Sequence, residues 1–315
     1  MFRLCLPGLQ FPKRHKRSIL LSIAQNRIAG LSFDIGVFSN ITRDHLDYHN
    51  SFEEYLNTKK QFFDSLDESA KSIVNIDDTY ASSMLIHTKS NKIFYGLNKN
   101  AHYNAFILES SLSGISLEIC NTRINTMLVG DFNAYNILAV FAVASELNQS
   151  KHQVLNLLST MSHVSGRFNI FQSENGITGI IDYAHTPDAL LKVIKSISHF
   201  CTVERDLIIV VGCGGNRDKG KRALMGKIAF ENSQKVIFTS DNPRFEKPEI
   251  IIEDMCIDLP DDLDGKIYKI INREEAINFA VHSASNGSII LVAGKGHEKF
   301  QEINGQKISF CDSQI

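Results

Sequence analysis

The second half of the chain alternates short apolar runs with amphipathic segments, and this alternation restricts its fold more than any other feature. The apolar runs, each expected to be a buried strand, are 177–182, 207–211, 236–240, 267–271 and 289–293. Segments with helical spacing lie between them, at 188–198, 221–231, 248–257 and 273–285. Strands that alternate with helices form a parallel sheet covered on both faces. We therefore predict a doubly wound, Rossmann-like α/β domain, with ligands beyond the carboxyl ends of its strands.

The first half has a different pattern. Strands are predicted at 33–38 and 72–76, and Ser51 is placed to cap a helix that continues to Phe63. From 92 to 128, short alternating runs separated by Gly and Asn predict antiparallel strands. Helices are expected at 133–147 and 151–161. The pattern changes at Gly166, where we place the domain boundary.

The composition excludes several classes of protein. The chain has 315 residues, a net charge of -2 and 43% hydrophobic residues, which is typical of a globular protein of about two domains. This charge provides no electrostatic field for nucleic acid. The six cysteines form no C-x-x-C pair, which argues against a zinc site or disulfide framework and favours a reducing cytoplasm. No apolar run approaches the ~20 residues of a membrane span.

Two polar motifs follow predicted strands of the second half. In Asp241-Asn242-Pro243-Arg244, the guanidinium of Arg244 offers a planar pair of donors that suits a ligand carboxylate. The alternative is a turn with a solvated arginine. The glycine-rich turn at 212–222 resembles a phosphate loop, but Arg222 stands where Ser or Thr should reach a metal. We therefore reject a phosphate loop there and interpret Arg217 as a candidate carboxylate ligand.

A third motif, Gly294-Lys295-Gly296-His297-Glu298, also follows an apolar run. Glycine lets the backbone approach a ligand closely, and the carboxylate of Glu298 can accept hydrogen bonds from an ammonium group. A tight turn with exposed charges explains the motif equally well.

The first half contributes two further candidate sites. His45 lies in a polar loop, and Lys59 lies on the following helix, so the pair could belong to a Mg²⁺ site if an anionic ligand accompanies them. A solvated loop is the alternative. Asn133 and Asn136 are three residues apart on one helical face, where their amides could pair with a purine edge. The alternative is that Asp131 or Asn133 only caps the helix.

Taken in order, these motifs resemble those of the Mur ligases of peptidoglycan synthesis, and most closely the members that add meso-diaminopimelate. The resemblance covers about 24–312. Its markers are 24–27, 40–49, 130–136, 166–167, 182–188, 212–222, 241–244 and 294–298. It implies a basic tail at 1–23, part of the central ATP-binding domain at 24–165, and the amino-acid-binding domain at 166–315. It also implies cytoplasmic cell-wall synthesis.

The resemblance assigns roles to individual residues. His45 and a carbamate formed on Lys59 would hold Mg²⁺ and take part in catalysis. ATP would be bound by the residues Asn133, Asn136, Arg167 and Asp182. The diaminopimelate pocket would comprise Arg217, Asp241, Asn242, Arg244, Gly294 and Glu298.

The implied reaction transfers the γ-phosphoryl group of ATP to the glutamyl carboxylate of UDP-N-acetylmuramoyl-L-alanyl-D-glutamate. The diaminopimelate amine then attacks the acyl phosphate. Lysine lacks the second carboxylate that Arg244 would pair with, so the motif favours diaminopimelate. The partners are therefore expected to be these small molecules, with neither nucleic acid nor membrane involved.

The sequence departs from the family at its start. The family's glycine-rich phosphate loop is absent, and Arg17 stands where the family has a glutamate metal ligand. We therefore expect a truncated polypeptide that is inactive alone. The alternatives are a lysine-adding or folylpolyglutamate synthase-like ligase, and a non-catalytic fragment that binds diaminopimelate.

Overall fold

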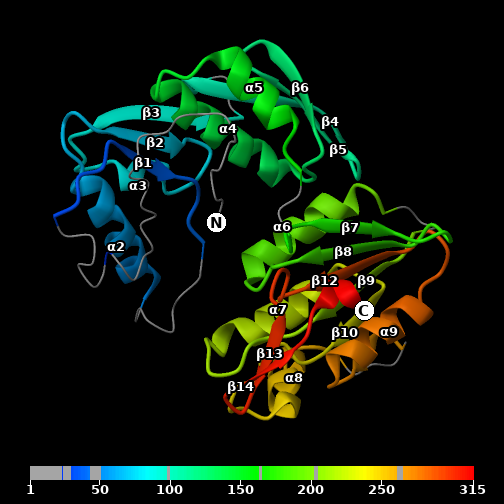
Figure 1. Cartoon of the computed structure of the whole chain (residues 1–315). Helices are drawn as coiled ribbons and strands as arrows, with labels where there is room; N and C mark the ends of the chain where they lie inside the picture. The colour runs from blue at the N-terminus through cyan, green and yellow to red at the C-terminus, as the bar shows by residue number, and fades with distance from the viewer. Residues whose placement is uncertain are drawn as a thin grey trace. The chain divides into compact units, whose positions relative to one another are not determined.

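A computed structural model describes residues 23, 30–42, 51–97, 100–162, 165–201, 205–260 and 265–315 (Figure 1). The chain divides into two compact units, Met1–Ser162 and His163–Ile315, each of which is described by itself. Within the described ranges, no helix is long and apolar enough to cross a membrane.

The sheet of the first unit contains a parallel part and an antiparallel part. Its strands, in their order across the sheet, are β1 (Ile35–Phe38), β2 (Lys71–Asn75), β3 (Asn91–Gly96), β4 (Tyr103–Ser111), β5 (Gly114–Ile119) and β6 (Thr122–Thr126). Strands β1 to β4 pair in parallel, whereas β4, β5 and β6 form an antiparallel meander.

The antiparallel prediction was wrong for the run at 93–95. This run lies in β3, which pairs in parallel with both of its neighbours. Parallel neighbours require a crossover connection. The segment between β2 and β3 provides one, and it contains the short helix α3 (Ala81–Met84). The strand β4 was not predicted.

Helix α2 (Phe52–Asp64) begins where the sequence predicts. The Ser51 side chain accepts a hydrogen bond from the Glu54 amide at 3.1 Å, which satisfies a backbone donor of the first turn. Tyr55 and Phe63 of this helix are buried against β1 and β2. The predicted cap is therefore confirmed.

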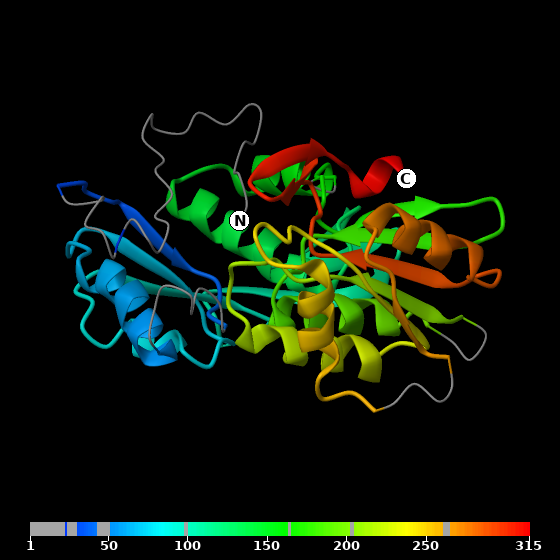
Figure 2. The ribbon, with the colours of Figure 1, turned by 90° about the horizontal axis from the view of Figure 1, so that it is seen from below.

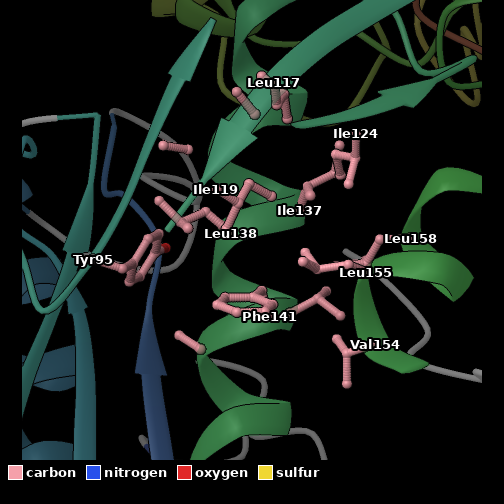
Figure 3. Close-up of a cluster of buried hydrophobic side chains, with 14 of the residues drawn as sticks. Tyr95, Leu117, Ile119, Ile124, Ile137, Leu138, Phe141, Val154, Leu155 and Leu158 are labelled. Carbon is pink, nitrogen blue, oxygen red and sulfur yellow. The ribbon is translucent and has the colours of Figure 1, made fainter. Parts of the chain in front are cut away.

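Helix α4 (Asp131–Glu146) is the central element of the first unit's core (Figure 3). It is apolar on most of its surface because it contacts the sheet as well as helix α5 (Lys151–Ser159). Phe141 packs edge-to-face on Tyr103, with ring centroids 5.8 Å apart. A helix that is buried on several sides needs apolar residues on most of its surface.

The second unit has the predicted doubly wound sheet. Its strands are β7 (Asn169–Gln172), β8 (Thr178–Asp182), β9 (Leu207–Val211), β10 (Lys235–Phe238), β11 (Ile267–Lys269) and β12 (Ile289–Ala293). Their order across the sheet is β11-β10-β9-β12-β8-β7, and all pairs except β7 with β8 are parallel. The edge strand β7 and the hairpin of β13 (Phe300–Ile303) and β14 (Gln306–Ser309) were not predicted.

Helices cover both faces of this sheet (Figure 2). One face packs on α9 (Arg273–His282), and the other on α6 (Pro187–Ser198), α7 (Gly220–Glu231) and α8 (Pro248–Cys256). Successive residues of β9 point to opposite faces of the sheet. Ile208 and Val210 belong to the hydrophobic cluster on the α9 face. Burial on both faces explains why the strands are apolar throughout.

Gly226 sets the close approach of α7 to α8. An added Cβ at this position would lie 1.8 Å from the Met255 carbonyl oxygen, which is backbone and cannot rotate away. We expect Gly226→Ala to lower the free energy of unfolding by about 1 to 3 kcal/mol, because the helices must separate. Urea denaturation measures this change. Lys227→Ala, at the exposed neighbouring position, is the control, and equal midpoints for the two variants would contradict the prediction.

Candidate functional site

The carboxyl ends of the central strands of the second sheet meet at one edge. Ala293 is in register with both Asp182 and Val211, so the loops after β12, β8 and β9 start at the same level. The Gly294 amide donates to the Asp182 carbonyl oxygen at 3.0 Å. Gly294 has φ 115°, and an added Cβ would lie 2.6 Å from Asp241 Oδ2. Only glycine allows the strand-end loops to pack this closely.

A buried lysine connects two of the predicted pocket residues. Lys295 is fully buried, and its Nζ donates to Asn242 Oδ1 and to Glu298 Oε2, each at 3.0 Å. Asn242 Nδ2 also donates to Glu298 Oε2, at 2.9 Å. A buried ammonium is stable only with such partners. These contacts fix Glu298 through one oxygen, and none of them uses Oε1.

Arg244 is held in a definite position. Its Nε donates to Glu302 Oε2 at 3.1 Å, and its Nη1 donates to the Gly215 carbonyl oxygen at 2.8 Å. Neither contact uses Nη2. The backbone of Arg244 has φ 53°, which is unusual for a residue with a side chain. The alternative of a freely solvated arginine is therefore wrong.

A salt-bridge cluster, defined here as Arg222, Glu246 and Asp254, supports the glycine-rich loop. Arg222 is fully buried and contacts both carboxylates, at 3.0 Å and 2.8 Å. Glu246 also accepts a hydrogen bond from the Asn216 amide, next to the exposed Arg217. Arg222 thus has structural partners where a phosphate loop would have a metal-binding hydroxyl.

The same cluster makes acid stability depend on Glu246. Hydrogen bonds from Arg222 lower the pKa of Glu246 from 4.5 to about 2. Because the folded pKa is depressed, the stabilisation is complete above the unfolded pKa and is lost as the pH falls from 4.5 towards 2.

We expect this loss to be about 2 to 3 kcal/mol. Urea unfolding measured across this pH window should show a steeper loss for the wild type than for Glu246→Gln. Glu231→Gln, which alters an exposed salt bridge of α7, should behave like the wild type. Parallel curves for all three proteins would contradict the assignment.

Tyr183, next to the end of β8, contacts a guanidinium and a tilted imidazole ring. The Arg167 guanidinium carbon lies 4.7 Å from the Tyr183 ring centroid, and the His297 ring centroid lies 5.1 Å from it.

The Asp182 carboxylate accepts hydrogen bonds from the Phe168 and Ala184 amides, each at 2.8 Å. Burial raises the pKa of Asp182. In this structure, Asp182 therefore fixes the backbone around Arg167. Its predicted contact with ribose stays a prediction.

The candidate nucleotide residues of the first unit lie at the start of α4. Asn133 Nδ2 donates to the Val129 carbonyl oxygen at 2.7 Å, and Asn136 Nδ2 donates to Asn133 Oδ1 at 3.1 Å. Asn133 therefore has a local structural role. Asn136 also lines an apolar hollow whose other walls are Leu128, Ile137, Val140 and Met161. The hollow is large enough for a water molecule but not for a purine, so the binding of a nucleotide there stays a prediction.

The metal site remains a prediction. His45 lies outside the described residues. Lys59 is half-buried on α2, with Nζ 4.7 Å from the Tyr55 ring centroid. No group of three or more His, Cys, Asp or Glu side chains suited to a metal occurs in the part of the chain that the structure describes.

The two units correspond to two domains of one enzyme family. Residues 21–144 match the Mur ligase middle domain, and 166–296 match the Mur ligase glutamate ligase domain. The chain belongs to the Mur ligase family.

Two similar relatives share one name. The chain is 46% identical over 294 residues to UDP-N-acetylmuramoyl-L-alanyl-D-glutamate--2,6-diaminopimelate ligase of Bacteroides thetaiotaomicron, covering 93% of this chain and 61% of that protein. It is 49% identical over 293 residues to the enzyme of the same name from Parabacteroides distasonis, covering 93% and 60%. The chain thus spans about three fifths of these relatives.

Two solved structures of Mur ligases align with this chain. A structure of UDP-N-acetylmuramoyl-L-alanyl-D-glutamate--2,6-diaminopimelate ligase aligns with a TM-score of 0.58 at 33% identity, covering 94% of this chain and 62% of that one. MurF ligase from Thermotoga maritima in complex with ADP aligns with a TM-score of 0.65 at 18% identity, covering 87% and 61%. The second likeness shows the fold alone.

Proposed function

We propose that this chain binds meso-diaminopimelate at the carboxyl edge of its second sheet. We also propose that it takes part in the ATP-dependent ligation of that amino acid to UDP-N-acetylmuramoyl-L-alanyl-D-glutamate. The observation that carries the proposal is the joint placement of Arg244 and Glu298. Asn242 hydrogen-bonds Glu298 directly, and Arg244 follows it two residues later. The names of the relatives support the same substrate.

The two charged side chains fit the two kinds of charge on such an amino acid. Arg244 is already fixed through Nε and Nη1, so a ligand carboxylate can pair with its terminal nitrogens without ordering a flexible side chain. Glu298 is fixed through Oε2 and can accept from an ammonium through Oε1. Arg217, on the adjacent glycine-rich loop, is a further candidate for the ligand's carboxylates.

Selectivity against lysine follows from desolvation. Lysine has no second carboxylate, so binding it would cover Arg244 without supplying a partner. A site built around a charged group rejects a ligand that leaves the group unpaired. We therefore propose that diaminopimelate, not lysine, is the amino acid used.

We also propose that Asn136, Arg167 and Asp182 take part in binding ATP, as the resemblance to the family implies. ATP would supply the phosphoryl group that activates the carboxylate.

Mg²⁺ would be held by His45 and a carbamate on Lys59. The Tyr55 ring near Lys59 stabilises the charged ammonium form of this lysine. Formation of the carbamate would therefore cost the energy of this contact.

We also propose a cytoplasmic location. Free thiols support it, because disulfides are rare in the cytoplasm. The free cysteines of the described residues are Cys120, Cys201, Cys213, Cys256 and Cys311.

Titration calorimetry on the whole chain tests the proposal. We expect saturable heat with meso-diaminopimelate and none above dilution with L-lysine at the same concentrations. Equal binding of the two amino acids would contradict the assignment. A coupled assay with ATP and both substrates then separates catalysis from binding alone, because binding releases no ADP and ligation makes ADP release depend on meso-diaminopimelate.

A further inference from the structure

We propose that Glu302, on the β13–β14 hairpin, is a positioning residue that sets the specificity of the site by orienting Arg244. The inference rests on the proposed function for the identity of the ligand. It assigns a role to a residue outside the motifs of the pocket, and to a hairpin that the sequence pattern does not predict.

Glu302 contacts both Arg244 and Asn242. Its Oε2 accepts from Arg244 Nε at 3.1 Å, and its carbonyl oxygen accepts from the Arg244 amide at 3.0 Å. Its own amide donates to Asn242 Oδ1 at 2.9 Å. The next residue, Ile303, forms a parallel β-bridge with Arg244, and the Asn304 amide donates to the Arg244 carbonyl oxygen at 2.6 Å. The hairpin therefore holds the backbone and side chain of Arg244 together.

This attachment explains the backbone of Arg244. A φ of 53° is unfavourable for a residue with a Cβ, and it persists only where surrounding contacts impose it. Hydrogen bonds to the hairpin on both sides of Arg244 impose it here. The conformation aims the side chain back to Gly215, whose carbonyl oxygen accepts from Nη1 at 2.8 Å.

The side-chain contact decides which edge of the guanidinium faces a ligand. A guanidinium can pair with a carboxylate through Nε and one terminal nitrogen, or through both terminal nitrogens. Glu302 occupies Nε, so a ligand carboxylate can use only the terminal edge. The site thereby accepts a carboxylate from one direction.

Glu302 could instead act as a competitor that the ligand displaces. The contacts favour positioning, because Nη2 takes no part in either side-chain bond of Arg244. The Glu302 side chain is also 27% exposed, so solvent screens its repulsion of a second carboxylate. The Arg244 side chain is already ordered before the ligand binds, so binding does not have to order it.

The test is Glu302→Gln, which keeps the shape of the side chain and removes its charge. We expect the dissociation constant for meso-diaminopimelate, measured by calorimetry, to rise about tenfold when a charge-assisted hydrogen bond becomes a neutral one. Ser309→Ala, an exposed position on the same hairpin, should bind like the wild type. Unchanged or tighter binding by Glu302→Gln would overturn the inference, because a competitor gives that result.

A second measurement does not depend on the ligand. The Arg244 Nε–H signal in ¹⁵N-resolved NMR, identified by its loss in Arg244→Lys, should shift and exchange faster with solvent in Glu302→Gln than in Ser309→Ala. An unchanged signal would overturn the positioning role. If the wild type binds no meso-diaminopimelate but the signal changes as expected, the proposed function fails and the positioning role stands.

Discussion

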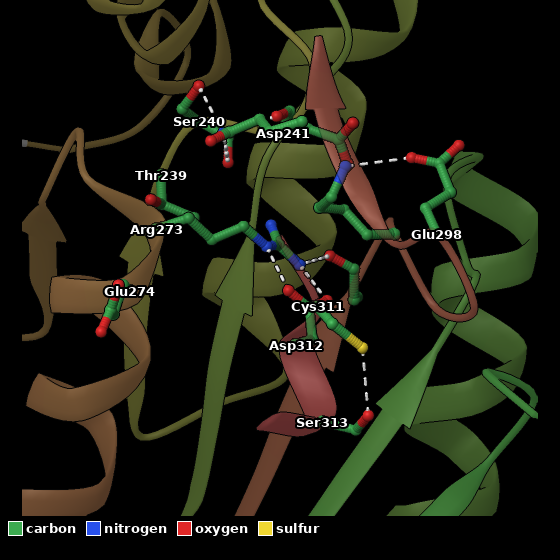
Figure 4. A network of polar contacts seen from close by, with 12 residues as sticks. Thr239, Ser240, Asp241, Arg273, Glu274, Glu298, Cys311, Asp312 and Ser313 are labelled. Atoms are coloured by element: carbon green, nitrogen blue, oxygen red, sulfur yellow. Dashed lines mark hydrogen bonds and ion pairs between the residues drawn. The ribbon is translucent and has the colours of Figure 1, made fainter. Parts of the chain in front are cut away.

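Replacing Asp312 with alanine should lower the free energy of unfolding of the second unit by about 3 to 5 kcal/mol, because it leaves a buried guanidinium without its counter-charge. Asp312 and Arg273 are both fully buried and form two hydrogen bonds, each of 2.8 Å (Figure 4). Arg273 Nη2 also donates to the Ala293 carbonyl oxygen at 3.0 Å, at the end of β12. The pair therefore joins the 3₁₀ helix at Asp312–Gln314 to the edge that carries the site.

Urea unfolding followed by circular dichroism measures this change, with Ser313→Ala at the exposed next position as the control. Arg273 Nη1 is among the buried polar atoms of the described residues that lack a partner, so the pair is already incompletely satisfied. Removing both charges, as in Arg273→Met with Asp312→Leu, should therefore destabilise less than Asp312→Ala alone. A loss below about 1 kcal/mol for Asp312→Ala, the range of exposed pairs, would contradict the account.

Arg244→Lys should weaken binding of meso-diaminopimelate by about 2 to 5 kcal/mol, which is roughly a 30-fold to several-thousand-fold rise in dissociation constant. Lysine keeps the positive charge but cannot make the planar contacts to Glu302, Gly215 and a ligand carboxylate together. Most of the expected loss is therefore a loss of geometry.

Calorimetry measures this effect. Arg205→Lys makes the same exchange at an exposed position of the same unit and should leave the dissociation constant unchanged. A change of less than threefold for Arg244→Lys would show that the ligand carboxylate binds elsewhere.

The sequence predicts most of the second unit's fold. Continuous apolar runs such as 207–211 became central strands because both faces of the sheet are covered. The strand β10 ends at Phe238, two residues earlier than predicted, because Thr239 and Ser240 already belong to the loop of the site.

The hairpin was missed for a physical reason. The residues of β14 are all exposed, so no periodic burial distinguishes them from a loop. Their pairing depends on β13, which is only partly buried and is joined to Arg244 by backbone hydrogen bonds. Backbone pairing of this kind leaves no mark on the side-chain pattern.

The candidate site shows the same limit. The residues expected at the strand ends, including Arg244 and Glu298, do lie at one edge, because parallel strands in register end together. The residues that hold them were not predicted. Lys295, whose role the motif does not indicate, is a buried bridge between Asn242 and Glu298. Glu302 and Glu246 are distant in sequence from the groups they fix, and a single sequence gives no signal for such partners.

A crystal of this chain soaked with meso-diaminopimelate tests the central claim most directly. We predict one carboxylate of the ligand within hydrogen-bond distance, about 3 Å, of the terminal nitrogens of Arg244, and an ammonium group beside Glu298. Arg244 Nε should still be bonded to Glu302. Density for the ligand at another place, or an Arg244 side chain turned away from a bound carboxylate, would contradict the account.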